Sequence, residues 1–518
     1  MRYHMHVVVV GGGIAGLVAS IDARALGMEV TLLESRPDTG GKVRTVTVGG
    51  KPIDRGPTVL TMRWVFDELF RETGAELSSV LETRPLDVLA RHAWGDTQLD
   101  LYRDVSRTRE AIAEAFGGRD ADAYVAFAAR TKQIYETALG PFLRSQRPTM
   151  AGMLAQAAKM GPWALHTIDA HRTLQKALES TFADERLVQL FGRYATYTGS
   201  SPVLAPATLA LIAHVERDGV EVVKGGMVAL RDALEARARE LGVSFVRGAH
   251  VRKIATKNGR VSHVVWDGAE IGADAVMFAG DVSALGTGLL GDDVRSAARV
   301  VPREERSLSA VTFSLVGRVR EGSTFTLDHH NVFFPDARGG GRKEHETLFA
   351  TRGRAMPSDP TVYVCAQDRG PFAPGVRGEP ERLFAILNAP ADGDTSPLSD
   401  EDIERCKDRM ISRLEASGLS LDVSSSTAHT PTSFAEAYPG SGGALYGAAS
   451  HGAFSALNRP SARTKVKGLY LVGGSVHPGA GVPMAALSGR LGVAALSEDL
   501  PSTARSRRAA TTGSISTR

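Results

Sequence analysis

Three glycines near the start of the chain have the spacing of a dinucleotide-binding turn. In the pattern Gly-x-Gly-x-x-Gly, Gly11 would make the tight turn and Gly13 would let the backbone approach a pyrophosphate. Gly16 would allow a helix to pack closely on a strand, and the amides that open this helix, near Ala15, would bind the anion. Glu34 follows at the separation at which a carboxylate accepts hydrogen bonds from ribose hydroxyls. These residues predict a dinucleotide site.

The elements around these glycines are those that such a site requires. The apolar run His6–Val10 predicts a strand that ends at the turn, and small residues through Ala23 predict the helix after it. A second apolar strand, Val30–Leu33, ends directly before Glu34. Because the motif stands in a strand–turn–helix–strand order, a dinucleotide site is favoured over the alternative, a glycine-rich turn without a ligand.

Two later turns could belong to the same site. Gly40-Gly41 precedes Lys42 and Arg44, and these cations could reach the dinucleotide. A hairpin turn with solvated charges is the alternative. The turn Gly56-Pro57-Thr58 could bring the backbone close to a flat cofactor, because glycine and proline permit tight turns.

Composition excludes several classes of function. The 518 residues include 61 basic and 58 acidic side chains, so no strong field favours a nucleic acid partner. Cys365 and Cys406 lie far apart without metal-ligand spacing, which argues against a zinc site or a disulfide framework and favours a reducing, cytoplasmic compartment. The sequence has no apolar run long enough to span a bilayer, which leaves attachment to a membrane surface possible.

The middle of the chain predicts a helical block and a second sheet. The pattern from Thr108 to His214 is mostly helical, and within it Pro141–Ile168 mixes apolar anchors with cations. That mixture suits a segment lying on an anionic membrane, and a methionine-rich core helix is the alternative. Gly339–Gly341 is expected to be a surface loop, and the tail after Pro501 is expected to be disordered. The apolar runs that predict the second sheet are Ser309–Leu315, Asn331–Phe334, Thr361–Cys365 and Leu383–Leu387.

Together these motifs resemble the flavin-dependent carotenoid desaturases of bacteria and fungi, within the larger group that includes amine oxidases and protoporphyrinogen oxidase. Within this family, Tyr438–Gly447 and Pro483–Arg490 are most similar to the 1-hydroxycarotenoid 3,4-desaturases, or methoxyneurosporene dehydrogenases. Lys42 departs from the pattern, since the larger group more often has Arg there. The resemblance covers the chain to about Leu500, and its other markers are Gly40-Gly41, Asp54–Thr58, His329–Phe334, Asn388-Ala389-Pro390 and His477–Pro483 through Ser488-Gly489.

The resemblance implies an α/β fold with three parts. A Rossmann-like FAD-binding domain of the amine oxidase (GR2) type would use residues 1–61, 220–300 and 462–500, and a mixed-sheet substrate domain would use 85–105 and 301–461. A helical cap would use 106–219. The residues expected to bind FAD are Gly11, Gly13, Ala15, Gly16, Glu34, Gly41, Lys42, Arg44, Gly56, Pro57, Thr58, Val251, Gly474, Gly481, Val482 and Pro483.

The resemblance also implies an activity, the removal of two hydrogens from an acyclic, 1-hydroxylated carotenoid with hydride transfer to the flavin. The substrate would come from a membrane to which the protein binds peripherally. The sequence does not identify the electron acceptor, for which oxygen and a quinone are the candidates. His477 is the candidate for proton handling or polar positioning, with a structural histidine as the alternative. Phytoene desaturase, carotenoid isomerase, flavin amine oxidase and a flavin-binding carotenoid carrier are the competing functions.

Overall fold

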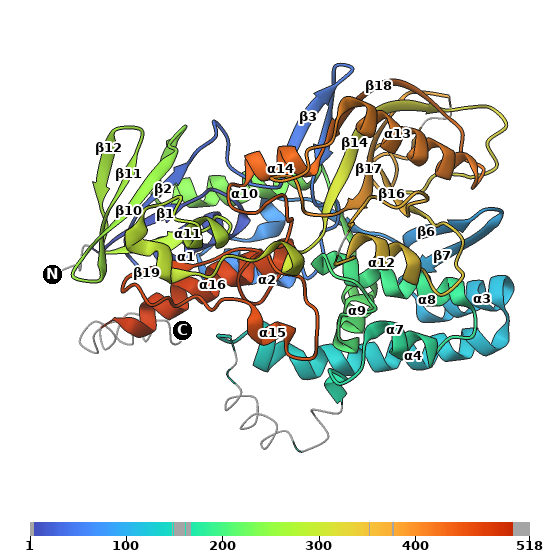
Figure 1. The fold of residues 1–518 in the computed structure, drawn as a ribbon, viewed down its shortest axis with the longest axis horizontal. Helices are drawn as coiled ribbons and strands as arrows, with labels where there is room; N and C mark the ends of the chain where they lie inside the picture. Colours follow the sequence, from blue (N-terminus) through green and yellow to red (C-terminus); the bar gives the residue numbers. More distant parts are fainter. Residues whose placement is uncertain are drawn as a thin grey trace, which may run out of the picture.

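The computed structural model describes residues 5–147, 149, 161, 167–351, 353–375 and 378–500 (Figure 1). Most of the segment predicted to lie on a membrane, and the predicted disordered tail, are outside these residues.

A five-stranded parallel sheet organises one half of the molecule, at the left of Figure 1. Its order is β19-β13-β1-β2-β9, so strands from both ends of the chain and from its middle lie side by side. Parallel strands are apolar along their whole length because both faces are covered, and β1 illustrates this. Val7 and Val9 pack in the core with four helices, whereas Val8 and Val10 face a three-stranded antiparallel sheet.

The elements of this half have the following bounds. The strands are β1 His6–Val10, β2 Glu29–Glu34, β9 Ser244–Arg247, β13 Ala275–Phe278 and β19 Leu469–Leu471. The helices on one face are α1 Ile14–Ala25, α10 Met227–Glu240, α16 Val482–Asp499 and α2 Trp64–Glu72, and the antiparallel sheet is β10 Val251–Lys257, β11 Arg260–Trp266 and β12 Ala269–Gly272.

A seven-stranded mixed sheet, at the upper right of Figure 1, forms the second half. Its order is β18-β14-β17-β16-β15-β6-β7, and among its neighbours only β15 and β6 run parallel. Helix α13 (Asp400–Glu415) covers one face, and the helical block covers the other. The strands are β6 Val88–Trp94, β7 Thr97–Tyr102, β14 Ser309–Val319, β15 His330–Phe333, β16 Val362–Ala366, β17 Glu381–Ala389 and β18 Leu421–His429.

The helical block lies below this sheet in Figure 1. Asp104 and Asp184 accept hydrogen bonds from backbone amides and cap α3 and α8. No helix among the described residues is both long and apolar enough to cross a membrane. The helices are α3 Val105–Phe116, α4 Gly118–Ala138, α7 Leu174–Glu179, α8 Glu185–Gly192 and α9 Leu211–Asp218.

Shorter elements connect these parts. They are β3 Arg44–Val48, β4 Lys51–Arg55, β5 Thr83–Pro85, β8 Glu221–Val223, α11 Ser283–Gly286, α12 Arg342–Leu348, α14 Pro431–Ala437 and α15 Ser455–Asn458. A π-helical turn, Leu139–Leu143, ends the long helix α4.

The prediction that Gly339–Gly341 is a surface loop is wrong for two of its three residues, because Gly340 and Gly341 are buried. A Cβ on Gly340 would lie 2.6 Å from Val188, and one on Gly341 would lie 2.8 Å from Gln189. Both glycines have positive φ, so their lack of a side chain lets the turn pack directly onto α8.

Candidate active site

The glycines of the first turn are held by close backbone contacts. A Cβ on Gly16 would lie 2.0 Å from the carbonyl oxygen of Gly11, so helix α1 can approach β1 only with glycine at this position. Gly11 has a φ of +102° and donates its amide to Leu33 O at 2.8 Å. The turn is therefore fixed at the carboxyl edge of the parallel sheet, where ligands of open α/β sheets bind.

Glu34 ends β2 beside this turn. Its buried carboxylate accepts hydrogen bonds from the amides of Gly12, at 2.7 Å, and Arg36, at 3.0 Å. A carboxylate has about four lone-pair sites, so acceptor capacity remains for a ligand. Val251, another predicted cofactor residue, is buried at the start of β10 in a cluster with Leu33.

Two helices begin at this edge without side-chain caps. The N-cap residues are Gly13 for α1 and Gly481 for α16, and neither helix start receives a side-chain cap bond from the described chain. Val482 and Pro483 form the first turn of α16. A Cβ on Gly489 would lie 2.5 Å from Ala15 O, so the two helices pack in direct contact. Gly489 lies two turns into α16, so the N-terminus of each helix offers its own free amides to a ligand.

The second glycine turn packs on the first. The Gly40 amide donates to Gly12 O at 2.7 Å, and a Cβ on Gly41 would lie 3.1 Å from Gly13 Cα. The predicted cations are engaged with the protein: Lys42 Nζ donates to Leu445 O, and burial lowers the pKa of Lys42 while nearby Asp281 raises it.

Arg44 is also engaged within this turn. Its guanidinium pairs with Asp38 at 3.0 Å and donates to Gly41 O at 2.9 Å. It therefore braces the turn, and its predicted contact with the cofactor stays a prediction.

The segment Tyr438–Gly447, which was most similar to one group of desaturases, lies directly on these turns. Tyr438 donates its hydroxyl to Gly41 O at 2.9 Å. A Cβ on Gly440 would lie 2.5 Å from the Ala284 amide nitrogen, and one on Gly447 would lie 2.7 Å from Ser475 Cβ. Its glycines are thus required by close contacts with elements that surround the first turn.

His477 is buried in the turn before α16. Its Nε2 lies 3.0 Å from Ser145 O, and burial lowers its pKa to about 4. The ring is therefore neutral at pH 7 and donates to a backbone carbonyl, which is the arrangement of a positioning residue. Proton handling by His477 stays a prediction.

A chain of polar side chains runs from Thr58 into the mixed sheet. Thr58 Oγ1 lies 2.6 Å from the hydroxyl of Tyr363, which lies 2.7 Å from Nδ1 of His330. His330 and Tyr363 line a small cavity between this sheet and the helical block. The importance of Tyr363 could not be found from the sequence, since it stands alone in an apolar strand without any motif.

Glu216 is a second polar group on this cavity. Tyr197 donates to it at 2.8 Å and Tyr194 donates to its other oxygen, while burial raises the pKa of the carboxyl. The Arg193 guanidinium lies 5.4 Å from the centroid of the Tyr363 ring. No spacing in the sequence connects these residues, so they could not be predicted from it.

Comparisons with known proteins identify the family. A sequence model described as flavin containing amine oxidoreductase matches residues 14–497. The chain belongs to this family. It is 45% identical to a hydroxyneurosporene desaturase from Rubrivivax gelatinosus over 100% of this chain and 98% of that protein. It is 42% identical to a hydroxyneurosporene desaturase from Cereibacter sphaeroides over 96% of this chain and 99% of that protein.

A solved structure shows the same fold at low sequence identity. An oxidoreductase from Methanosarcina mazei superposes with a TM-score of 0.61 and 17% identity, covering 96% of this chain and 100% of that one. The predicted fold class is confirmed, and so is the predicted carotenoid desaturase family, because the matched hydroxyneurosporene desaturases align over nearly the whole chain.

As a flavin-containing oxidoreductase, the protein uses FAD, and the sheet edge fits this cofactor. The uncapped start of α1 suits its pyrophosphate, the uncapped start of α16 is expected to face its flavin and ribityl end, and Glu34 suits a ribose. The backbone is also open where a ligand must approach it. A Cβ on Gly474 would meet no described atom within 4 Å, and one on Gly13 would meet only Gly41 Cα, at 3.8 Å.

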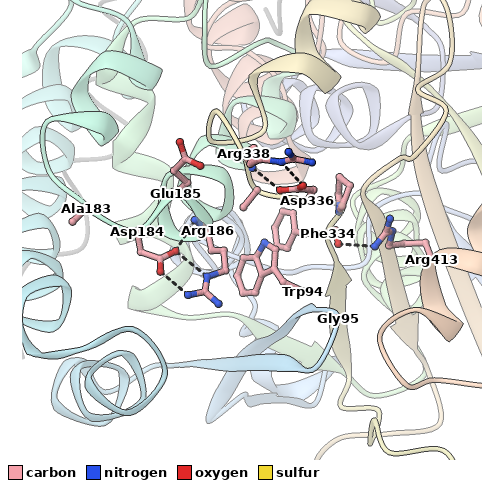
Figure 2. Close-up of a pocket in the computed structure, with 12 residues that line it drawn as sticks. Trp94, Gly95, Ala183, Asp184, Glu185, Arg186, Phe334, Asp336, Arg338 and Arg413 are labelled. Carbon is pink, nitrogen blue, oxygen red and sulfur yellow. Dashed lines mark hydrogen bonds and ion pairs between the residues drawn. The ribbon is translucent and has the colours of Figure 1, made fainter.

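In this flavoprotein a larger cavity of about 530 Å³ opens where the mixed sheet meets α8 (Figure 2). Its floor is the stacked pair Trp94 and Phe334, whose ring centroids are 4.8 Å apart. Figure 2 shows ion-paired side chains around this floor, Asp184 with Arg186 and Asp336 with Arg338. The cavity therefore combines an aromatic base with a charged rim.

Proposed function

We propose that this protein is an FAD-dependent desaturase that introduces a C=C bond into an acyclic, 1-hydroxylated carotenoid at the 3,4-position. The observation that carries the proposal is the identity of 40–45% with three hydroxyneurosporene desaturases over at least 96% of this chain. Alignment over nearly the whole chain, which includes the segments of the cofactor edge and of both cavities, supports the same reaction class.

The chain's own residues perform tasks that fit this chemistry. When bound, FAD supplies a hydride acceptor. The apolar side chains of Val59, Leu89 and Leu190 on the small cavity exclude water from a reacting polyene. Loss of a hydride from an allylic carbon leaves a cation spread over the conjugated chain, which lowers the need for a strong base at the neighbouring C–H. Neutral, buried His477 is consistent with that requirement.

An aromatic face connects the linings of the two cavities. His92 and Val332 line the small cavity. Two positions further along the chain, Trp94 at the end of β6 and Phe334 just after β15 line the larger one. The His92 ring stacks on Trp94 at 6.4 Å and on Phe334 at 6.1 Å between centroids. A continuous aromatic face suits a flat polyene.

The proposal includes the three-part organisation and a membrane contact. Residues 1–61, 220–300 and 462–500 supply all five strands of the parallel sheet, which supports their assignment to one FAD domain. Pro141–Ile168 would dock a cytoplasmic protein onto the membrane that holds its substrate. Of its described cations, Arg144 pairs with Glu68 at 2.8 Å and Arg147 donates to Leu457 O at 2.8 Å. Docking would therefore rest mainly on the apolar side chains.

Anaerobic reduction of the flavin by carotenoids in liposomes tests this function. A 1-hydroxylated acyclic carotenoid should bleach the flavin and gain one conjugated double bond, and phytoene should not. Bleaching by phytoene instead would favour phytoene desaturase, and rearrangement without net bleaching would favour an isomerase. Oxygen or a quinone added afterwards identifies the electron acceptor. Flotation of the same liposomes shows whether the protein travels with the membrane.

A further inference from the structure

One buried nitrogen in the small cavity has no partner. His330 is 3% exposed, and its Nε2 has no hydrogen-bond partner among the described residues. A buried polar atom without a partner is uncommon and costs free energy. Because His330 lines the cavity, a polar group of a bound ligand would satisfy this atom.

The other ring nitrogen of His330 is fixed by its neighbours. Nδ1 lies 2.7 Å from the hydroxyl of Tyr363, which in turn lies 2.6 Å from Thr58 Oγ1. Burial lowers the pKa of His330 well below its usual range, so the ring is neutral, with one donor nitrogen and one acceptor nitrogen. Rotation of the Tyr363 and Thr58 hydroxyls decides whether Nδ1 accepts or donates a hydrogen bond, and Nε2 then has the opposite role. An alcohol can pair with Nε2 in both cases, because a hydroxyl group both donates and accepts.

The position of this nitrogen agrees with the chemistry of the proposed substrate. The cavity has about 10 Å³ of free space, which is room for about one water-sized group such as a hydroxyl. In a 1-hydroxylated carotenoid, the hydroxyl-bearing carbon is separated by only one carbon from the bond that becomes C3=C4. The group that binds the hydroxyl must therefore lie beside the flavin, and Thr58 belongs to the turn expected to approach it.

We propose that Nε2 of His330, supported by Tyr363 and Thr58, binds the hydroxyl of the substrate and selects hydroxylated over non-hydroxylated carotenoids. This inference rests on the proposed function and names its specificity-determining residue. The nearby carboxylate of Glu216 does not compete for this role, because Tyr194 and Tyr197 already donate to its two oxygens. A substrate without the hydroxyl would leave Nε2 buried and unsatisfied.

The same region contains one competing arrangement. His329, His330 and Cys365 are buried and place a ligand atom each within 4.8 Å of one another, which could hold a metal ion. His329 Nδ1 lies 2.6 Å from Arg369 O, and its Nε2 lies 3.8 Å from Cys365 Sγ, so both of its nitrogens already have protein partners. Only His330 contributes an atom without a partner, which favours a hydroxyl over a metal.

The test compares substrate preference in three variants. His330→Leu removes the nitrogen, and Tyr363→Phe removes the hydroxyl that supports it. His345→Leu is the matched control, because His345 is also buried with an unpartnered nitrogen among the described residues but does not line the cavity. We measure kcat/KM and equilibrium binding, by quenching of tryptophan fluorescence, for a 1-hydroxylated acyclic carotenoid and its counterpart without the hydroxyl.

We expect His330→Leu to lower the preference for the hydroxylated compound on the order of 10- to 100-fold, mainly through weaker use of that compound. Tyr363→Phe should lower it less, and His345→Leu should leave it unchanged. Flavin absorbance and thermal unfolding verify that each variant is folded. If His330→Leu does not fold, the substrate preference of Tyr363→Phe tests the inference instead.

Several results would overturn the inference. The first is an unchanged preference for the hydroxylated carotenoid in folded His330→Leu. The second is equal binding of both carotenoids by the wild type. The third is one equivalent of metal bound to the wild type and absent from His330→Leu. Failure of the proposed function looks different. The wild type would then bind the hydroxylated compound preferentially, in a manner dependent on His330, while its flavin stays oxidised.

Discussion

The cofactor edge and the polar cluster of the small cavity recognise ligands in different ways. At the edge the groups available to a ligand are mostly backbone amides, presented by two helices that start at glycine. In the cluster the group left for a ligand is Nε2 of His330, a side chain supported by two others from distant positions, Thr58 and Tyr363. The first site depends on side chains being absent, and the second depends on tertiary structure bringing them together.

This difference predicts where a single added atom does the most damage. Gly16→Ala would place a Cβ 2.0 Å from Gly11 O, and a backbone oxygen cannot move away cheaply. We expect a loss of about 3 kcal/mol in the free energy of unfolding, together with loss of bound FAD. Chemical denaturation and the flavin-to-protein absorbance ratio measure the two effects.

Gly118→Ala is the matched control for that substitution. Gly118 opens α4, and a Cβ there would meet no described atom within 4 Å. Its stability should change by less than about 1 kcal/mol, with full FAD content. Equal behaviour of the two variants would show that the close approach of α1 to β1 is not what holds the cofactor edge.

Glu34 is a side chain at the edge on which FAD recognition is expected to depend. Glu34→Gln keeps the shape of the side chain but replaces the charged carboxylate by a neutral amide. The carboxylate accepts a hydrogen bond from the Gly12 amide at 2.7 Å and is expected to accept one from the ribose. We expect FAD to dissociate on the order of 10- to 100-fold more readily, because hydrogen bonds to charged groups are worth about 1.5–3 kcal/mol. Quenching of flavin fluorescence during titration measures this, and an unchanged affinity would remove the ribose contact.

Features of the cofactor edge that depend on consecutive residues could be predicted from the sequence. The strand His6–Val10, the turn and the helix after it are local, so their spacing was sufficient to place them, and the structure has β1 at the same residues. The hairpin at Asn258-Gly259 joins β10 and β11 as turn chemistry predicts. These features depend on a few consecutive residues.

Features that depend on distant pairing could not be predicted. The run Ser309–Leu315 predicted a strand of the second sheet but not its surroundings. Ser309 through Gly317 are all buried in β14, because α13 covers one face of this strand and the β3–β4 hairpin covers the other. The parallel pairing of β15 with β6 places Asn331 opposite Arg91, and no local signal encodes that register. The contact of His330 with Tyr363 follows from the antiparallel pairing of β15 with β16. The sequence alone offers the His329-His330 pair as a candidate substrate contact, with a structural pair as the alternative, and offers no sign of Tyr363.

His477 joins the cofactor edge to the segment that leaves α4, and its substitution should have the smallest effect. Its ring donates to Ser145 O and lies 6.2 Å from the Phe142 ring, between centroids. If it is a positioning residue, His477→Asn should lower kcat/KM less than about tenfold and leave the pH profile between pH 6 and 8 unchanged. A profile that loses an inflection in the variant would instead show that His477 handles a proton.

The dependence of stability on pH tests the role of His477 in a second way. Its pKa is about 4 in the folded protein and near 6.5 in an unfolded chain, so the unfolded state binds a proton first as the pH falls. Its contribution is fully present above pH 6.5 and declines toward pH 4, by about 1.4 kcal/mol per pH unit. Between pH 7 and 5 the wild type should therefore lose about 2 kcal/mol more unfolding free energy than His477→Asn. An equal loss would mean that the imidazole is accessible to protons in the folded state, and the catalytic reading of His477 would then be favoured over the positional one.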